Sequence, residues 1–233
     1  MTEQLVFDLP QRVALGRDAF LVADSNAEAI ALIDNAAAWT QPVQWIYGPA
    51  GSGKSHLAAV LANQLCAYTV PAAALSADSE VAHILAGETA TEILVVDALD
   101  ELPQAGEETL FHLLNQARHG GVPILLLSRH PAARLSVALP DLVSRLKAIS
   151  AISLGAPCDA LVVGLIGKLF ADRQVQADAR VIDFLLPRID RDYKAMGDLV
   201  AAIDAAALAE QRAITVPLVA KVLDCHIAVT DDD

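Results

Sequence analysis

Cysteines, long apolar runs and a secretory leader are scarce or missing in this sequence, and each shortage excludes a class of protein. The three cysteines, Cys66, Cys158 and Cys225, are not clustered, so neither a disulfide framework nor a cysteine metal site is expected. No apolar run approaches the roughly 18 uninterrupted residues of a membrane span. The first residues have neither the basic start nor the apolar stretch of a secretory signal. We therefore expect a cytoplasmic protein without a membrane partner.

Basic residues are also few. Lys and Arg number 16 against 29 Asp and Glu, which gives a formal net charge of −13. Proteins that bind duplex DNA tightly neutralise its phosphates with Lys and Arg, so this chain is not expected to do so by itself. Hydrophobic residues make up 55% of the 233 residues, enough for one large core or for a core with a small second domain.

Short apolar runs alternate with helical patterns between residues 43 and 154. Several runs are almost continuously apolar, as expected for parallel strands that are buried on both faces. The predicted strands cover 43–47, 67–70, 92–96, 123–127 and 149–154, and helical patterns cover 55–65 and 107–119. This alternation predicts a doubly wound α/β fold, with a parallel sheet between two helical layers.

The pattern becomes purely helical after residue 155. The helical stretches are 159–173, 178–187, 191–211 and 216–226. We therefore divide the chain into an N-terminal peptide (1–10), an α/β domain (11–155) and a small all-α domain (156–233).

The stretch GPAGSGKS matches the phosphate-binding loop G-x-x-x-x-G-K-[ST], between a predicted strand and a helix that begins near Lys54. Its glycines let backbone N–H groups and the helix N-terminus surround phosphate oxygens. Lys54 adds a charge near the terminal phosphates, and Ser55 offers a hydroxyl to Mg²⁺. The residues expected to bind nucleotide in this P-loop are Gly48, Pro49, Ala50, Gly51, Ser52, Gly53, Lys54, Ser55 and His56.

An acidic residue that suits Mg²⁺ follows the apolar run EILVV. Asp97 ends this run, where its carboxylate can reach the ion held by Ser55; the alternative is an Asp that merely ends a strand. Many hydrolysing P-loop proteins have a second acid directly after this Asp, and here that position is Ala98. We therefore expect slow hydrolysis of the chain's own ATP. Asp100 and Glu101 could substitute, although surface residues that open a loop are the simpler interpretation.

These motifs together resemble the AAA+ ATPases, and within them the Hda/DnaA-like family. The likeness covers roughly residues 4 to 224. DAFLVADSNAEAIALI looks like the segment that packs on adenine, and GPAGSGKSHLA has the His-Leu pair of the group. PILLLSRHP, LPDLVSRLKA and RIDRDYKAMGDLVAAIDAAAL resemble the sensor 1 strand, the arginine-finger segment and the sensor 2 helix. The resemblance implies an AAA+ P-loop NTPase, with a parallel-sheet αβα core followed by a small all-α lid.

The resemblance also implies roles for residues outside the P-loop. Phe20, Leu21 and Val22 would face adenine, and Ser128 would be the polar tip of sensor 1, unless it is a strand-end Ser without a nucleotide contact. Arg145 stands in the position of the arginine finger, which acts on a neighbour's nucleotide; an ordinary Arg on a helix surface is the alternative.

Two residues compete for the sensor 2 role. Lys194 matches best, with Arg191 one turn earlier as a rival, and either could be a solvated basic residue at a helix start. The family usually has Arg, and Lys lacks its planar fork, so a weaker grip on phosphate is expected. Initiators carry a helix-turn-helix domain after the lid. None is recognised here, so we do not expect the chain to be an initiator by itself.

The opening stretch EQLVFDLP resembles the short motif with which members of this family bind the DNA sliding clamp. An extended segment projects alternate residues to one side. Leu5, Phe7 and Leu9 could therefore enter one hydrophobic groove while Gln4 forms hydrogen bonds at its rim. The alternative is a strand at the edge of the chain's own sheet.

The function that the resemblance implies is an adaptor, bound to the clamp, that stimulates ATP hydrolysis by DnaA and so restrains replication initiation. Its own ADP or ATP, with Mg²⁺, would be mainly structural. A self-contained ATPase, such as a DnaC-type helicase loader or a transposition helper, is the alternative. A P-loop kinase would need an Arg-rich substrate lid, which the Ala-rich C-terminal helices do not offer. The resident nucleotide and a homo-oligomeric state stay open.

Overall fold

A computed structural model describes residues 22, 23, 25–175 and 177–230. Its first part is a five-stranded parallel sheet in the order β2-β3-β4-β1-β5. The strands are β1 (Val43–Tyr47), β2 (Ala67–Pro71), β3 (Ile93–Asp97), β4 (Ile124–Ser128) and β5 (Ala151–Ser153). Each predicted strand is therefore present, within a few residues of its predicted bounds.

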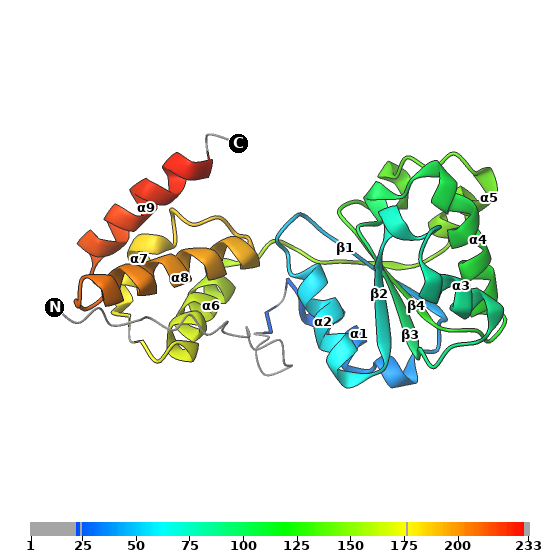
Figure 1. The fold of residues 1–233 in the computed structure, drawn as a ribbon, viewed down its shortest axis with the longest axis horizontal. Coiled ribbons are helices and arrows are strands. Elements are labelled where there is room, and N and C mark those ends of the chain that lie inside the picture. Colours follow the sequence, from blue (N-terminus) through cyan, green and yellow to red (C-terminus); the bar gives the residue numbers. More distant parts are fainter. Residues whose placement is uncertain (1–21, 24, 176, 231–233) are drawn as a thin grey trace.

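Helices cover both faces of the sheet (Figure 1). The helices of the α/β domain are α1 (Ala27–Asp34), α2 (Lys54–Gln64), α3 (Ser79–Ala86), α4 (Gln104–Arg118) and α5 (Pro140–Lys147). Short 3-10 turns lie at Ala36–Ala38, Ala72–Ala74, Leu99–Glu101 and Ala132–Arg134. Helices α1 and α2 share one apolar cluster with the sheet, and α3, α4 and α5 share the other.

Strand β4 shows why the central strands read as continuous apolar runs. Ile124 and Leu126 belong to the cluster under α3, α4 and α5, whereas Leu125 and Leu127 belong to the cluster under α1 and α2. Successive side chains of a strand point to opposite faces, so a strand that is covered on both faces needs an apolar residue at every position. The predicted αβα core is thus confirmed.

The second part is an all-helical domain that Figure 1 shows beside the α/β domain. It contains α6 (Asp159–Asp172), α7 (Ala179–Leu185), α8 (Tyr193–Ala209) and α9 (Val216–Thr230). These helices enclose a separate core, in which Phe170, Met196 and Val219 are at most 1% exposed. The predicted boundary after residue 155 falls in the connection between β5 and α6. Among the helices that the structure describes, none is long and apolar enough to cross a membrane.

Candidate nucleotide-binding site

The P-loop connects β1 to α2 at the carboxyl edge of the sheet. Gly51 and Gly53 have φ values of 69° and 94°, in the left-handed region that glycine adopts without a steric penalty. Gly48 lies so close to β5 that a Cβ there would be 2.1 Å from the carbonyl oxygen of Leu154. Gly53 is the N-cap of α2 and provides no side-chain cap, so the first N–H groups of this helix can turn to phosphate oxygens.

Lys54 is folded back onto this loop. Its Nζ donates hydrogen bonds to the carbonyl oxygens of Gly48 and Pro49, both at 2.7 Å. Partial burial lowers the pKa of Lys54 from its ordinary value, although the nearby carboxylates of Asp97, Asp100 and Asp192 act in the opposite direction. The third hydrogen bond of Lys54 Nζ, to Ser52 Oγ at 3.4 Å, is also to a neutral group. A partly desolvated cation whose hydrogen-bond partners are neutral is a suitable partner for a polyphosphate.

Ser55 and Asp97, the residues predicted to hold Mg²⁺, lie side by side. The Ser55 hydroxyl donates to Asp97 Oδ2 at 2.9 Å, and the Ala98 N–H donates to Oδ1 at 2.8 Å. A hydroxyl beside a carboxylate is a pair of hard oxygen ligands, which Mg²⁺ prefers when the remaining positions are filled by water and phosphate. These two residues therefore fit the ion and would hold it beside the terminal phosphates, where it would neutralise their charge.

Asp100 and Glu101, the two acids that follow Asp97, both contact the loop after β4. Both carboxylate oxygens of Asp100 accept backbone N–H bonds, from Arg129 and His130, so Asp100 holds the loop after β4. Glu101 forms an exposed ion pair with Arg129 at 3.4 Å. These contacts favour structural roles for Asp100 and Glu101. Ala98, which stands directly after Asp97, has no carboxylate.

Ser128 ends β4 and is fully buried. Its hydroxyl accepts a hydrogen bond from Trp45 Nε1 at 2.8 Å and donates one to the carbonyl oxygen of His130 at 2.7 Å. Its only proton is therefore used within the sheet edge. The predicted sensor 1 contact with nucleotide stays a prediction, and it requires this hydroxyl to exchange its partner.

The lid packs directly on the P-loop. Asp192 precedes α8 and lies so close that a Cβ on Gly51 would be 2.2 Å from Asp192 Oδ2. The next residue, Tyr193, donates its N–H to the Gly51 carbonyl oxygen at 3.4 Å. Its ring lies parallel to that of His56, with 6.4 Å between the centroids. Asp192 and Tyr193 were missed by the sequence reasoning, although both lie inside the stretch RIDRDYKAMG.

Burial affects the titration of these aromatic groups. It lowers the pKa of His56 from its ordinary value, so a neutral imidazole is favoured near neutral pH. Burial also raises the pKa of Tyr193, against the effect of a hydrogen bond to Asn26. The P-loop, the start of α1 and the lid therefore meet in one cluster.

The two candidates for sensor 2 are placed differently. The Arg191 guanidinium donates to the Pro157 carbonyl oxygen at 2.9 Å and forms an ion pair with Asp159. It thus ties the start of α8 to the connection between the domains. Lys194 lies in the first turn of α8, and its side chain is outside the described part. These positions do not test whether Arg191 or Lys194 contacts a nucleotide phosphate, so both contacts stay predictions.

The predicted adenine-facing residues are mostly outside the described residues. Phe20 and Leu21 fall there, as do the clamp-motif residues Gln4, Leu5, Phe7 and Leu9. Val22 is described and its side chain is 58% exposed. An exposed apolar residue ahead of α1 is compatible with a role in covering a base.

Arg145 lies on α5, at the end of the α/β domain away from the lid (Figure 1). Its guanidinium stands over the Phe111 ring, 4.7 Å from the centroid, in a hollow between α4 and α5. The position of α5 depends on Glu107, a residue that the sequence analysis missed. The buried Glu107 carboxylate accepts the N–H groups of Ala138 and Leu139 at 2.9 and 2.7 Å, just before α5 begins.

Known proteins are similar to this chain in sequence and in fold. A family model described as "Hda, lid domain" matches residues 169–223. A protein of Haemophilus influenzae, described only as uncharacterised, is 31% identical over 193 residues, 79% of this chain and 82% of that one. Domain III of the Thermotoga maritima initiator DnaA covers 93% of this chain and 98% of its own, with a TM-score of 0.76 at 17% identity. The chain belongs to the Hda/DnaA-like AAA+ family.

This family membership confirms the α/β core and the lid as an AAA+ fold. The structure of DnaA from Aquifex aeolicus bound to AMPPCP is also similar, with a TM-score of 0.67 at 19% identity over 79% of this chain and 63% of that one. AMPPCP is a nucleotide, and the intact P-loop of our AAA+ chain is suited to the same class of ligand.

Replacing Asp192 by Asn is expected to tighten ADP binding severalfold. The Asp192 carboxylate packs on Gly51 and interacts electrostatically with Lys54, so its negative charge opposes that of incoming phosphates. Asn preserves the hydrogen bond that Oδ1 accepts from the Ala195 N–H at the start of α8, because Asn caps helices as well as Asp does. Calorimetric titration with ADP measures the change.

The matched control is Asp198→Asn, which removes one charge from an exposed position on the same helix. Its ADP affinity should equal that of the wild type. An Asp192→Asn protein that binds ADP no more tightly than the control would contradict an opposing role for this carboxylate.

Proposed function

We propose that this chain is a nucleotide-bound adaptor that binds the DNA sliding clamp and stimulates ATP hydrolysis by DnaA. Through this activity it would restrain replication initiation in the cytoplasm. The observation that carries the proposal is the placement of Arg145. Its guanidinium is on α5 and rests on Phe111, whereas the chain's own P-loop adjoins the lid through Tyr193. This placement favours action on a nucleotide held by a neighbouring molecule.

The proposed chemistry takes place on the nucleotide of DnaA. Water attacks the γ-phosphorus, the bond between that atom and the β–γ bridging oxygen breaks, and ADP and inorganic phosphate remain while a proton from the water is released to solvent. Arg145 donates to phosphoryl oxygens as their charge redistributes, and an arginine supplied in trans can accelerate such a reaction by roughly 10³ to 10⁵. Arg145 remains a cation throughout, so it stabilises charge and moves no proton.

The chain's own nucleotide is proposed to be ADP with a structural role. The P-loop and the lid already touch through Gly51 and Tyr193, and a nucleotide between them would fix the angle of the two domains. Ala98 offers no carboxylate to orient water, which supports slow turnover. Identification of the nucleotide that co-purifies with the protein is the direct test of this part.

The experiment that tests the whole proposal measures the ADP fraction on DnaA. ATP-loaded DnaA is incubated with the chain and a DNA-loaded clamp, and the bound nucleotide is separated at intervals. The proposal expects ADP to accumulate only when both the chain and the clamp are present. Hydrolysis that is unaffected by the chain would overturn it.

Substituting Leu5 and Phe7 by Ala is expected to abolish clamp binding, because an alternating apolar motif gains its affinity by filling a groove of the partner. Clamp binding is measured by surface plasmon resonance. A paired variant, Thr2→Ala with Glu3→Ala, changes neighbouring residues outside the motif and should bind normally. If the Leu5 and Phe7 substitutions instead lower the melting temperature by many degrees, the stretch contributes to the chain's own fold.

A self-contained ATPase is the second candidate, and the pairing of Ser55 with Asp97 favours it. That pair suits the Mg²⁺ that accompanies ATP during hydrolysis. A steady-state ATPase assay without partners separates the two functions, because brisk turnover supports the motor and is inconsistent with the adaptor.

A further inference from the structure

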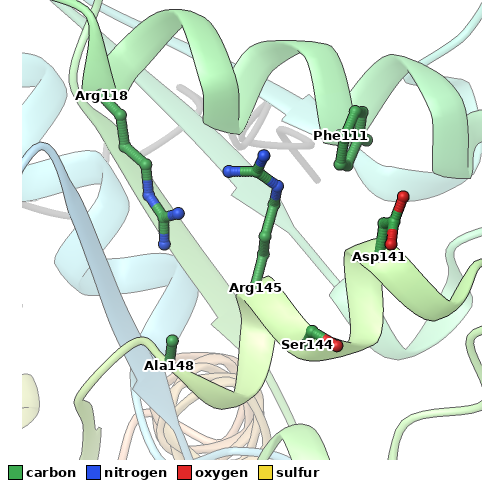
Figure 2. A pocket seen from close by; sticks show the side chains of 6 residues that line it. All are labelled: Phe111, Arg118, Asp141, Ser144, Arg145 and Ala148. Carbon is green, nitrogen blue, oxygen red and sulfur yellow. The ribbon is translucent and has the colours of Figure 1, made fainter.

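A second arginine lines the hollow that holds Arg145. Arg118 is the last residue of α4, and Arg145 lies in the last turn of α5. The lining is completed by Phe111, Asp141, Ser144 and Ala148. Figure 2 shows the Arg118 side chain extending from the end of α4 toward Ala148, while the Arg145 side chain rises from α5 toward α4. The two guanidinium groups thus share one open space between the helices.

Neither guanidinium is neutralised within the described part of the chain. No acidic side chain there forms an ion pair with Arg118 or Arg145, and the described ion pairs involve other residues. Asp141 lines the same hollow and is the one acid that does so. Two like charges that face one space repel each other, so an anion bound between them would relieve this repulsion.

The position of Arg118 at the end of α4 offers a simpler explanation for a cation there. A cation in the last turn of a helix interacts favourably with its carbonyl end. That effect requires only a charge close to the helix terminus. It does not account for the direction of the Arg118 side chain, which leaves α4 and reaches across the hollow toward the end of α5 (Figure 2).

We propose that Arg118 and Arg145 form one site for the phosphate chain of a nucleotide bound to a neighbouring molecule. Both guanidinium groups bond oxygens of the terminal phosphate, Arg145 from α5 and Arg118 from the end of α4. Arg118 is thus a binding residue that makes the interface selective for a partner that holds a triphosphate. The inference rests on the proposed function, in which that partner is DnaA, and it adds a residue that recognises the state of the partner's nucleotide.

The chemistry of the two guanidinium groups suits a shared phosphate. A guanidinium presents a planar fork of N–H donors and bonds phosphate oxygens at more than one point. A terminal phosphate has three free oxygens, so two such groups can bond it together. A diphosphate lacks this outermost group and leaves both forks without that partner, which lowers the affinity for the ADP-bound molecule.

The test compares the affinity of the full chain for DnaA loaded with AMPPCP and for DnaA loaded with ADP, both with DNA-loaded clamp. The wild type should prefer the AMPPCP form about tenfold, the value of a hydrogen-bonded charged group. Arg118→Ala should bind the AMPPCP form about tenfold more weakly and lose most of the preference. Arg118→Lys should restore part of it, because it keeps the charge and loses the fork.

Two further variants separate phosphate recognition from general charge. Asp141→Asn removes the acid from the hollow and should strengthen binding of the AMPPCP form. Lys147→Ala removes an exposed cation from the same helix but outside the hollow, and it should match the wild type. An equal loss of affinity for both DnaA forms in Arg118→Ala would make Arg118 an ordinary contact between proteins and overturn the inference, as would an unchanged preference.

Results that exclude the proposed adaptor function differ from results that exclude only the role of Arg118. If wild-type chain neither binds DnaA nor raises its ADP fraction, the adaptor itself is excluded. If wild-type chain stimulates hydrolysis normally and Arg118→Ala keeps the full preference for the AMPPCP form, only the role of Arg118 is excluded.

Discussion

Lys54→Ala is expected to abolish measurable nucleotide binding. In the wild type the Lys54 Nζ is held by the Gly48 and Pro49 carbonyl oxygens, directly at the loop that should surround the phosphates. Without it, the P-loop keeps its N–H groups but has no side-chain cation for the terminal phosphates. Calorimetric titrations with ADP and with ATP should both show no saturable heat.

A thermal shift provides the second measurement. A ligand at 100 times its Kd stabilises a protein by about 2.7 kcal/mol, so ADP should raise the melting temperature of the wild type and leave that of Lys54→Ala unchanged. Wild-type affinity in the variant would show that the phosphates bind elsewhere.

When both proteins are free of nucleotide, Lys54→Ala is expected to melt within about 2 °C of the wild type. Burial lowers the pKa of Lys54 in the folded chain. The stability linked to this shift is present only above the unfolded pKa of about 10.4 and is lost as the pH falls through the folded pKa. At pH 7, where Lys54 is charged, the lowered pKa therefore adds nothing to the stability of the folded chain. Replacing Lys54 by Ala removes no stabilisation that comes from this pKa shift.

The strands and the P-loop could be predicted from the sequence because their signals are local. Strand β3 lies within one residue of its predicted bounds, since a strand covered on both faces is apolar along its length, as the buried run from Ile93 to Val96 is. Helices α1 and α3 are absent from the helical patterns predicted from the sequence, and each has only 8 residues. Two turns are too few for a clear periodic pattern, although Asp78 and Gly87 cap α3 at its ends.

Contacts between distant segments could not be predicted in this way. The hydrogen bond from Trp45 to Ser128 exists because β1 lies beside β4, an arrangement that depends on the strand order. The packing of Asp192 on Gly51 depends on how the lid meets the core. Arg118 looks like an ordinary helix-ending cation until α5 is placed opposite it. The sequence specified the phosphate loop, whereas the structure was needed to find the residues that surround it.

Arg145→Ala is expected to reduce clamp-dependent stimulation of DnaA by at least about 10³-fold, the lower end of the effect of an arginine in trans. The side chain packs on Phe111 at 4.7 Å, and α5 lies at the end of the α/β domain away from the lid (Figure 1), whereas the chain's own P-loop contacts the lid. Removal of the Arg145 side chain should therefore leave the chain's ADP affinity, clamp binding and melting temperature close to wild type. The measurement is the ADP fraction on DnaA after incubation with DNA-loaded clamp and each variant.

Arg145→Lys should be nearly as damaging as Arg145→Ala, because a Lys ammonium is a hydrated point charge without the fork that spans two phosphoryl oxygens. Lys147→Ala, on the same helix and exposed, should stimulate normally and so controls for loss of charge from α5. Full stimulation by Arg145→Ala would assign the finger to another residue or exclude the adaptor. Loss of the chain's own nucleotide in that variant would show that Arg145 acts within its own molecule, because a residue confined to the partner interface has no means of weakening a site on the opposite side of the fold.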